Sequence, residues 1–521
     1  MCRTISLRST CLNSAFSVYT LWIDHPKAAS CFSRPSASHF QSINDFMSLI
    51  NNNLGAYEYI HRTLLFEYHD FELPYLEDID IKMNKGKMYL PGEYIVSNLL
   101  GKGERARPNT WKQALISLSK RNFSAPRVNE KLDVLATAER LCQGLFRCFN
   151  FSKLYENYDP VVPDLNKLGE WLASRDGAKF GKLKASLNHT LLVDQFQPLK
   201  FMIKGDMKPK MDTSSYSAYD PPANIIYYKN VVNLFYSPLF LEIFDRICYC
   251  LSHKVIMYSG MNLETLADLI ASNLTMPVNC YHTTEIDFRM FDKSQGTLFK
   301  VYEEVVYKTF KFSEEIYDNI KFTEYFTRYT GDCGVSGELG AQRRTGSPNT
   351  WLSNTLVTLG ILMTEYNLDD MELILVSGDD SLIFSKNPLP NVTAEINRDF
   401  GFEAKFLMNS VPYFCSKFIY QDGGRLKVTP DAQRMFEKLS VPIRRRDFEE
   451  GTLLKERFIS YKDLMRDYMK DTTCIHVDHM LAIRHGIPPM SSYAALCYIH
   501  CMFANMVAFR KIFDERFSVN I

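Results

Sequence analysis

Acidic side chains lie at the ends of apolar segments in the middle of the chain. Asp287 belongs to a predicted short strand, residues 285–288, in which alternation places it on the face opposite its apolar neighbours. Asp379 and Asp380 follow a glycine between two apolar segments, so they are expected at the tip of a β-hairpin. Neighbouring carboxylates repel each other, and a divalent cation relieves that repulsion. The pattern therefore predicts a metal site.

Magnesium chemistry on phosphates needs few protein ligands. Mg²⁺ favours one or two carboxylates, several waters and substrate phosphates. Two such ions about 4 Å apart can activate an attacking hydroxyl and stabilise a leaving pyrophosphate. Asp287 and Asp379 meet this requirement if their strands converge. Taken alone, the Gly-Asp-Asp tripeptide favours a solvated turn, and its surroundings reverse that balance. Asp369–Asp370, which lacks the preceding strand and glycine, is given no role.

Helices and strands in the same region are expected to hold these acids in place. Apolar residues recur at helical spacing over residues 262–272 and 354–365. The apolar segments 373–376 and 381–384 are predicted as the strands of the hairpin, and the tail from about residue 430 as mostly helical. One further amphipathic helix is predicted from the apolar stripe formed by Leu298, Val301, Tyr302, Val305 and Val306.

Composition sets broad limits. The 521 residues exceed a typical single domain, which predicts two or three packed subdomains. Lysine plus arginine and aspartate plus glutamate number 60 each, so net charge gives no argument about nucleic acid. Thirteen cysteines without a repeating spacing favour a reducing compartment. We find no run of about 18 apolar residues, so no membrane span is predicted. The serine-rich first 50 residues are not expected to be a targeting signal.

Three segments, taken in order, resemble the palm motifs of positive-strand RNA virus polymerases. They are DFRMFDKSQ at 287–295, QRRTGSPNTWLSNT at 342–355 and SGDDSLI at 377–383. More narrowly, residues 402–405 and 410–418 resemble the alphavirus-like group and, within it, the closteroviruses of plants. The order and spacing of the segments make a joint chance occurrence very improbable.

The resemblance implies an α+β fold, the right-hand polymerase with fingers, palm and thumb, whose palm is an antiparallel sheet flanked by helices. It is strongest over about residues 195–430. The implied division is an N-terminal extension of unknown role at 1–100, fingers at 101–275, a catalytic palm at 276–425 and a mostly helical thumb at 426–521.

The same resemblance implies roles for the acids. Asp287 and Asp379 would bind two Mg²⁺ ions, for which Mn²⁺ could substitute, with Asp380 as a nearby, less essential acid. Asp292 and Asn354 would recognise the ribose 2′-hydroxyl. A buried site built to bond a hydroxyl strongly rejects substrates without it. Reverse transcriptases usually carry a bulky residue where Asp292 stands, so the resemblance favours RNA synthesis over DNA synthesis.

Other implied contacts involve the nucleotide and template. Thr345 and Gly346 would form a flexible loop touching both, and Thr350 would assist in selecting the nucleotide. The glycines at 331, 334, 337 and 340 are expected to form a mobile connection before this loop.

Lysines complete the implied site. Lys204 and Lys208 would bind the triphosphate, although the family more often has arginine where this chain has Gly205. Lys405 matches a proposed general acid for the departing pyrophosphate, and an exposed lysine beside Glu403 is an equally good interpretation. At the growing 3′ end, the primer-strand contact would be Lys417.

The resemblance also implies partners: RNA template and product, nucleoside triphosphates, and a viral methyltransferase–helicase replication protein. In that family the polymerase is typically made by ribosomal frameshifting downstream of those domains, so Met1 need not be a natural start. The implied location is the host cytoplasm at membrane-associated replication complexes, with host membranes contacted only indirectly. Two alternatives are a reverse transcriptase with the same palm and a non-enzymatic RNA-binding scaffold descended from a polymerase.

Overall fold

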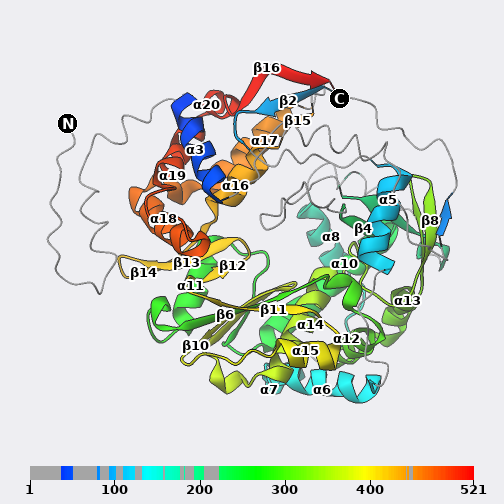
Figure 1. Ribbon diagram of the computed structural model, residues 1–521. Coiled ribbons are helices and arrows are strands. Elements are labelled where there is room, and N and C mark those ends of the chain that lie inside the picture. The colour runs from blue at the N-terminus through cyan, green and yellow to red at the C-terminus, as the bar shows by residue number, and fades with distance from the viewer. Residues whose placement is uncertain are drawn as a thin grey trace.

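Helices and strands are interleaved along the whole described chain (Figure 1). The computed structural model describes residues 37–50, 79–81, 93–100, 109–123, 132–156, 159–175, 181, 193–204, 222–441, 443–444 and 450–520. Within these residues the fold is α+β, as predicted. The region considered as a targeting signal lies largely outside the described residues.

A five-stranded sheet forms the centre of the molecule. Its order is β11-β6-β10-β9-β5, and all neighbours are antiparallel except β5 and β9, which run parallel. The expected antiparallel sheet is therefore mixed at one edge, because β5 comes from the upstream part of the chain. The strands are β5 (Val255–Met257), β6 (His282–Phe288), β9 (Leu373–Ser377), β10 (Asp380–Ser385) and β11 (Ala404–Asn409).

Both faces of this sheet are covered, because alternate residues of each strand point to opposite sides. Ile374 and Ile383 belong to the core shared with helices α12 (Thr297–Thr309) and α14 (Thr350–Glu365). Leu375 and Leu382 belong to a second core, shared with α11 (Leu263–Asn273) and a small sheet. That sheet has the order β12-β13-β14 and consists of β12 (Tyr413–Phe414), β13 (Lys417–Asp422) and β14 (Arg425–Pro430).

Helix α14 is buried on all sides over residues 352–363. The prediction of a helix here is confirmed, but the amphipathic pattern is wrong, because the helix runs through the core between the sheet and α6 (Val134–Phe146). A helix in this position must satisfy its polar side chains internally. It carries four such side chains, Ser353, Asn354, Thr355 and Thr358.

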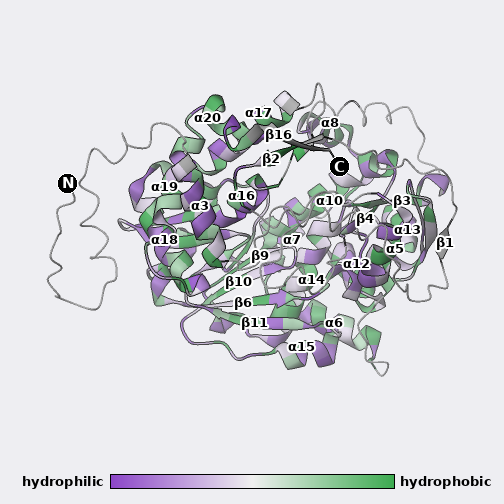
Figure 2. Cartoon of the chain, turned by 45° about the horizontal axis from the view of Figure 1, so that its top comes forward, coloured by the Kyte–Doolittle hydropathy of each residue, from purple (hydrophilic) through white to green (hydrophobic). Residues whose placement is uncertain are grey.

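Helix α12 also departs from the predicted stripe. Val305, expected in the core, is 38% exposed, whereas Lys300 and Glu303 are buried. Hydrophobic periodicity treats lysine and glutamate as surface residues, so it could not detect a buried pair of opposite charges. Peripheral helices such as α6 and α15 (Thr393–Phe400) do have mixed hydrophobic and hydrophilic surfaces (Figure 2).

A second five-stranded sheet lies beside the first, in the order β1-β8-β7-β3-β4. The glycine-rich segment predicted as a mobile connection forms its strands β7 and β8, so that prediction is wrong. Gly331 packs closely, since a Cβ there would lie 2.8 Å from Phe201 Cδ1. The strands are β1 (Ile79–Ile81), β3 (Leu199–Ile203), β4 (Asn224–Tyr227), β7 (Thr327–Gly331) and β8 (Val335–Leu339). Further helices before residue 430 are α5 (Trp111–Leu118), α7 (Phe151–Tyr155), α8 (Leu165–Ala173), α10 (Asn230–Cys250) and α13 (Glu314–Tyr325).

The C-terminal part is mostly helical, as predicted, and it includes segments from the N-terminal region (Figure 1). Helix α3 (Ala37–Ile50) packs against α19, and β2 (Glu93–Ser97) lies between β15 (Ile443–Arg444) and β16 (Phe513–Asn520). The sequential division at 100, 275 and 425 stays a prediction. The helices are α16 (Ala432–Leu439), α17 (Glu450–Leu464), α18 (Asp471–His485), α19 (Tyr493–Met502) and α20 (Met506–Arg510).

Among the described helices, none combines the length and apolar character that a membrane span requires. The cysteines in the described residues are free thiols.

His485, at the end of α18, gives a pH-dependent stability. Its Nε2 is buried without a hydrogen-bond partner among the described residues. Burial, together with the charges of Arg484 and Arg434, lowers its pKa from 6.5 to about 4. The unfolded chain therefore binds a proton that the folded chain does not, so stability is lost as the pH falls from 6.5 towards 4. Between pH 7 and pH 5, the unfolding free energy of the parent should fall by about 1 kcal/mol more than that of His485→Gln, allowing for solvent screening.

Urea unfolding followed by circular dichroism at the two pH values measures this difference. His253→Gln, at an exposed histidine, is the control and should behave like the parent. Equal pH-dependent losses in the parent and in His485→Gln would contradict the expectation.

Candidate active site

The predicted acidic strand and acidic turn are neighbours in the central sheet. Along β6, Ile286 and Phe288 are buried and Asp287 is exposed, which confirms the predicted alternation. The hairpin between β9 and β10 is also confirmed: Asp380 pairs with Ser377. Its turn begins at Gly378, whose φ of +65° is accessible to glycine at little cost.

Strand pairing brings the aspartates together. Strands β6 and β10 are antiparallel neighbours, with Ile383 opposite Thr284. Continuing that register by three residues on each strand places Asp287 opposite Asp380 and beside Asp379. The hydroxyl of Ser381 lies 3.3 Å from the Ile286 carbonyl oxygen, so the strands remain close at this end. All three aspartates are therefore gathered at one end of the sheet, two on adjacent strands and one in the turn.

Glu285 adds a fourth carboxylate that sequence reasoning missed. Burial raises its pKa, and the charges of Asp287 and Asp380 raise it further. A hydrogen bond from Asn409 Nδ2, 2.7 Å from Glu285 Oε2, acts in the opposite direction. The signal was its position two residues before Asp287, on the same face of the strand.

Helix α14 holds the acidic turn from behind. The Gly378 amide donates to Thr355 Oγ1 (2.9 Å), and Thr358 Oγ1 donates to the Gly378 carbonyl (2.8 Å). The Trp351 indole N–H adds a bond to Ser377 Oγ (3.0 Å). The two threonines fix both backbone polar groups of the glycine, and Trp351 fixes the residue before it. None of the three was assigned this role from the sequence.

The two residues expected to recognise the ribose are in direct contact. Asn354 Nδ2 donates to Asp292 Oδ1 (2.8 Å), and Gln295 Nε2 donates to Asn354 Oδ1 (2.9 Å). Asn354 and Thr355 are consecutive in α14, so one helix joins the amide at Asp292 to the acidic turn. Thr350, one turn earlier, donates its hydroxyl to the Arg344 carbonyl (2.7 Å).

Thr345 and Gly346 are hydrogen-bonded to β4, and the flexibility of this loop stays a prediction. The Ile226 amide donates to Thr345 Oγ1 (3.2 Å), and the Gly346 amide donates to the Ile226 carbonyl (2.9 Å). A Cβ at Gly346 would lie only 2.4 Å from Tyr227 Cβ. The contact with template and nucleotide stays a prediction.

Gly346→Ala should therefore destabilise the protein by about 1–3 kcal/mol, because β4 or the loop must move to admit a methyl group. Gly340→Ala is the matched control, since a Cβ there meets no atom within 4 Å. Urea unfolding of the two variants measures the difference. Equal stability of Gly346→Ala and Gly340→Ala would show that the loop yields freely.

The predicted lysines occupy different settings. Lys405, on β11, pairs in register with Asp287, while Glu403 forms its ion pair with Arg289 (2.8 Å). Lys417 Nζ donates to the Cys415 carbonyl (2.8 Å), and burial lowers its pKa.

Of the two lysines assigned to the triphosphate, Lys204 is exposed just after β3. Lys208 lies outside the described residues.

The candidate site therefore consists of a mixed sheet with an acidic hairpin turn, an aspartate on the adjacent strand and a buried helix behind them. A family model described as RNA dependent RNA polymerase matches residues 68–512. The chain belongs to this family.

Particular relatives narrow the placement. The chain is 34% identical over 374 residues to replicase polyprotein 1ab of Beet yellows virus, which is 71% of this chain and 12% of that protein. It is 30% identical over 498 residues to replicase polyprotein 1ab of Grapevine leafroll-associated virus 3 (93% and 17%). A third relative, RNA-directed RNA polymerase 2a of Pelargonium zonate spot virus, is 27% identical over 434 residues (81% and 60%).

The predicted likeness to closterovirus polymerases is confirmed. The family match also extends further on both sides than the window of 195–430. The chain spans less than a fifth of the two polyproteins and about three fifths of the third relative.

Proposed function

We propose that this chain is a viral RNA-directed RNA polymerase that replicates a positive-strand genome. It joins the 3′-hydroxyl of a growing RNA to the α-phosphate of a nucleoside triphosphate, directed by an RNA template, and releases pyrophosphate. The observation that carries the proposal is the convergence of Asp287, Asp379 and Asp380 at one end of the central sheet. Asn354, which bonds Asp292, directly precedes the threonine of α14 that bonds the acidic turn. Family membership supports the same reaction.

The acids fit a site for two Mg²⁺ ions, with Mn²⁺ as a substitute. Asp287 and Asp379 are exposed, and the raised pKa of Glu285 reflects, in part, the negative charge gathered beside it. The described residues include no group of three or more His, Cys, Asp or Glu side chains that could hold one ion by themselves. The proposed ligands are Asp287 and Asp379, with Asp380 as a nearby, less essential acid and with substrate phosphates and water completing each shell. When bound, such ions activate the attacking hydroxyl and stabilise the leaving group.

The protein's other side chains would position the substrate. Asp292 and Asn354 would meet the ribose 2′-hydroxyl, while Lys204 and Lys208 would neutralise the triphosphate. Lys405, which pairs in register with Asp287 on the neighbouring strand, would protonate the departing pyrophosphate.

The three parts of the fold would correspond to a right hand. The central sheet with α11, α12 and α14 would be the palm, and the second sheet with α5 the fingers. Helices α16 to α20 would be the thumb. The proposed partners are RNA, nucleoside triphosphates and a methyltransferase–helicase replication protein, at membrane-associated complexes in the host cytoplasm. The naming of two relatives as replicase polyproteins supports such a partner.

A primer-extension assay on a primed RNA template tests the function. The proposal expects templated incorporation of ribonucleotides that requires Mg²⁺ and stops when EDTA is added. Preferred incorporation of deoxyribonucleotides would instead identify a reverse transcriptase. RNA binding without extension under any divalent metal would identify a non-enzymatic RNA-binding protein.

A further inference from the structure

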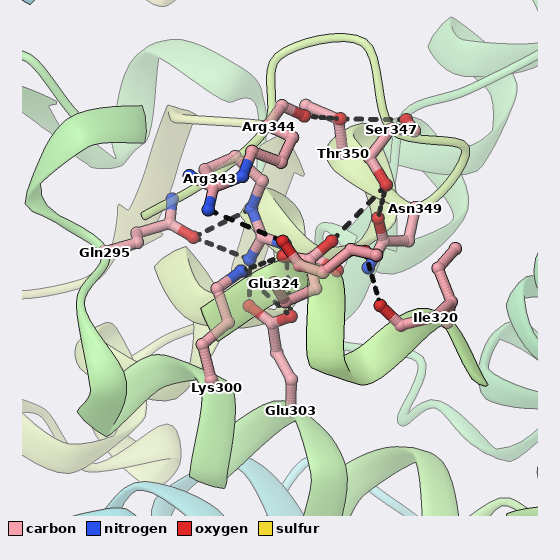
Figure 3. Close-up of polar contacts among 12 residues, drawn as sticks. Gln295, Lys300, Glu303, Ile320, Glu324, Arg343, Arg344, Ser347, Asn349 and Thr350 are labelled. Carbon is pink, nitrogen blue, oxygen red and sulfur yellow. Dashed lines mark hydrogen bonds and ion pairs between the residues drawn. The ribbon is translucent and has the colours of Figure 1, made fainter. Parts of the chain in front are cut away.

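Arg343 occupies the centre of a buried polar network (Figure 3). The network adjoins the Asp292–Asn354 pair through Arg343 Nε, which donates to Asn354 Oδ1. Its guanidinium pairs with Glu303, and both side chains are fully buried. It also donates to Gln295 Oε1 from Nε (3.0 Å) and from Nη2 (2.6 Å). The roles assigned above make no use of Arg343.

Charge in this network is balanced. Lys300 pairs with Glu324, and Arg343 Nη1 lies 3.1 Å from Glu303 Oε2 and 3.8 Å from Glu324 Oε2. Two cations therefore face two carboxylates, which is the condition under which buried charges are tolerated. Burial lowers the pKa of Arg343 to about 9, so the guanidinium remains charged at neutral pH. The network can thus hold Arg343 in one orientation.

The geometry dictates which way the Asn354 amide faces. A guanidinium only donates hydrogen bonds, and Arg343 Nε, whose single hydrogen is shared with Gln295 Oε1, lies 3.1 Å from Asn354 Oδ1. Gln295 Nε2 donates to the same oxygen (2.9 Å). With two donors directed at Oδ1, the amide must present its Nδ2 group to Asp292. The reversed amide would place its oxygen against the Asp292 carboxylate and its N–H groups against the guanidinium.

We propose that Arg343 is a positioning residue for sugar recognition, acting through the amide of Asn354. This inference rests on the proposed function. One hydrogen of Asn354 Nδ2 is donated to Asp292 Oδ1 at 2.8 Å, and the second remains for the oxygen of a ribose 2′-hydroxyl. The Asp292 carboxylate accepts the proton of that hydroxyl. The pair is complementary to a hydroxyl only in this amide orientation, so Arg343 sets the preference for ribonucleotides without touching the substrate.

Arg344 provides a matched comparison. It is the next residue and is equally buried, but its Nε donates to Thr327 Oγ1 (2.8 Å) and its Nη2 to the Gly340 carbonyl (2.7 Å). It therefore anchors the loop to β7 and β8. A purely structural effect of losing a buried arginine should be common to both positions, whereas an effect on sugar choice should be confined to Arg343.

The test compares kcat/KM for ribonucleotides and deoxyribonucleotides on a primed RNA template. The double variant Arg343→Met/Glu303→Met removes the ion pair without stranding a buried charge. We expect its ribo-to-deoxy ratio to fall about tenfold or more from that of the parent. Arg344→Met should keep the ratio within about twofold, even where its unfolding midpoint declines.

A parent-like ratio in the folded double variant would overturn the inference. Asp292→Ala in the same experiment distinguishes a failure of the role of Arg343 from a failure of the proposed function. If Asp292→Ala lowers the ratio and the double variant does not, the role of Arg343 fails and the proposed function stands. If the parent does not extend the primer, the proposed function itself fails. Should the double variant be unfolded by circular dichroism, Arg343→Lys retains the charge but loses the planar guanidinium, whose separate nitrogens bond Glu303 and both amide oxygens at once. The same fall is expected there, and a parent-like ratio would equally overturn the inference.

Discussion

Asp379→Ala and Asp287→Ala should each reduce primer extension at least about a thousandfold while RNA binding largely survives. Each change removes a carboxylate proposed to bind the metal ions. The proposed ions would stabilise the attacking and leaving oxygens, so the loss should fall on the chemical step. Both side chains are exposed, so the folded structure should tolerate the substitutions. Single-turnover extension measures the chemistry, and filter binding of primed RNA measures the complex.

Asp369→Ala and Asp370→Ala are the matched controls. These exposed acids lie in the short helix Leu368–Asp370, a few residues before the hairpin, and should leave extension unchanged. Normal extension by either Asp287→Ala or Asp379→Ala would contradict the assignment of the site. Loss of RNA binding in step with extension would point to misfolding instead.

The second large effect concerns the sugar. Asp292→Ala and Asn354→Ala should lower the ratio of ribonucleotide to deoxyribonucleotide kcat/KM by about 100-fold or more, because a site that bonds a hydroxyl loses its selectivity with the bond. Asn354→Ala also removes the hydrogen bonds of Asn354 with Asp292, Gln295 and Arg343, so the stability of this variant should decline as well.

Ser353→Ala is the control for the second effect. Its hydroxyl contacts the Tyr307 hydroxyl at 2.5 Å, on the neighbouring position of α14. The variant should lose some stability and keep the sugar ratio. If instead Asp292→Ala discriminates sugars as the parent does, the ribose assignment is wrong, although the metal site is unaffected.

The acidic part of the site could be predicted because its signals are local. Alternation fixed the face of Asp287, and a glycine between two apolar strands fixed the turn that carries Asp379. The convergence of the two required only that the strands be neighbours. The resemblance added a shared ribose role for Asp292 and Asn354, and the structure adds that these residues, 62 positions apart, are hydrogen-bonded to each other.

The features of the site and fold that could not be predicted depend on contacts between residues far apart in the sequence. Glu303 and Arg343 are 40 residues apart, and each looks like a surface residue in its own segment. Thr355 and Thr358 gain their role only because α14 lies directly behind the hairpin. Likewise, β2 pairs with strands more than 300 residues downstream, which no local pattern indicates.

The central claim is that the carboxylates of Asp287 and Asp379 bind the same pair of ions. The most direct measurement is anomalous scattering from Mn²⁺ in crystals of the enzyme with a primed RNA template and a non-hydrolysable ribonucleoside triphosphate. We expect two peaks about 4 Å apart, with oxygens of both aspartates about 2.2 Å from the metal. Peaks bound by only one of these residues, or placed away from the turn at Gly378, would contradict it.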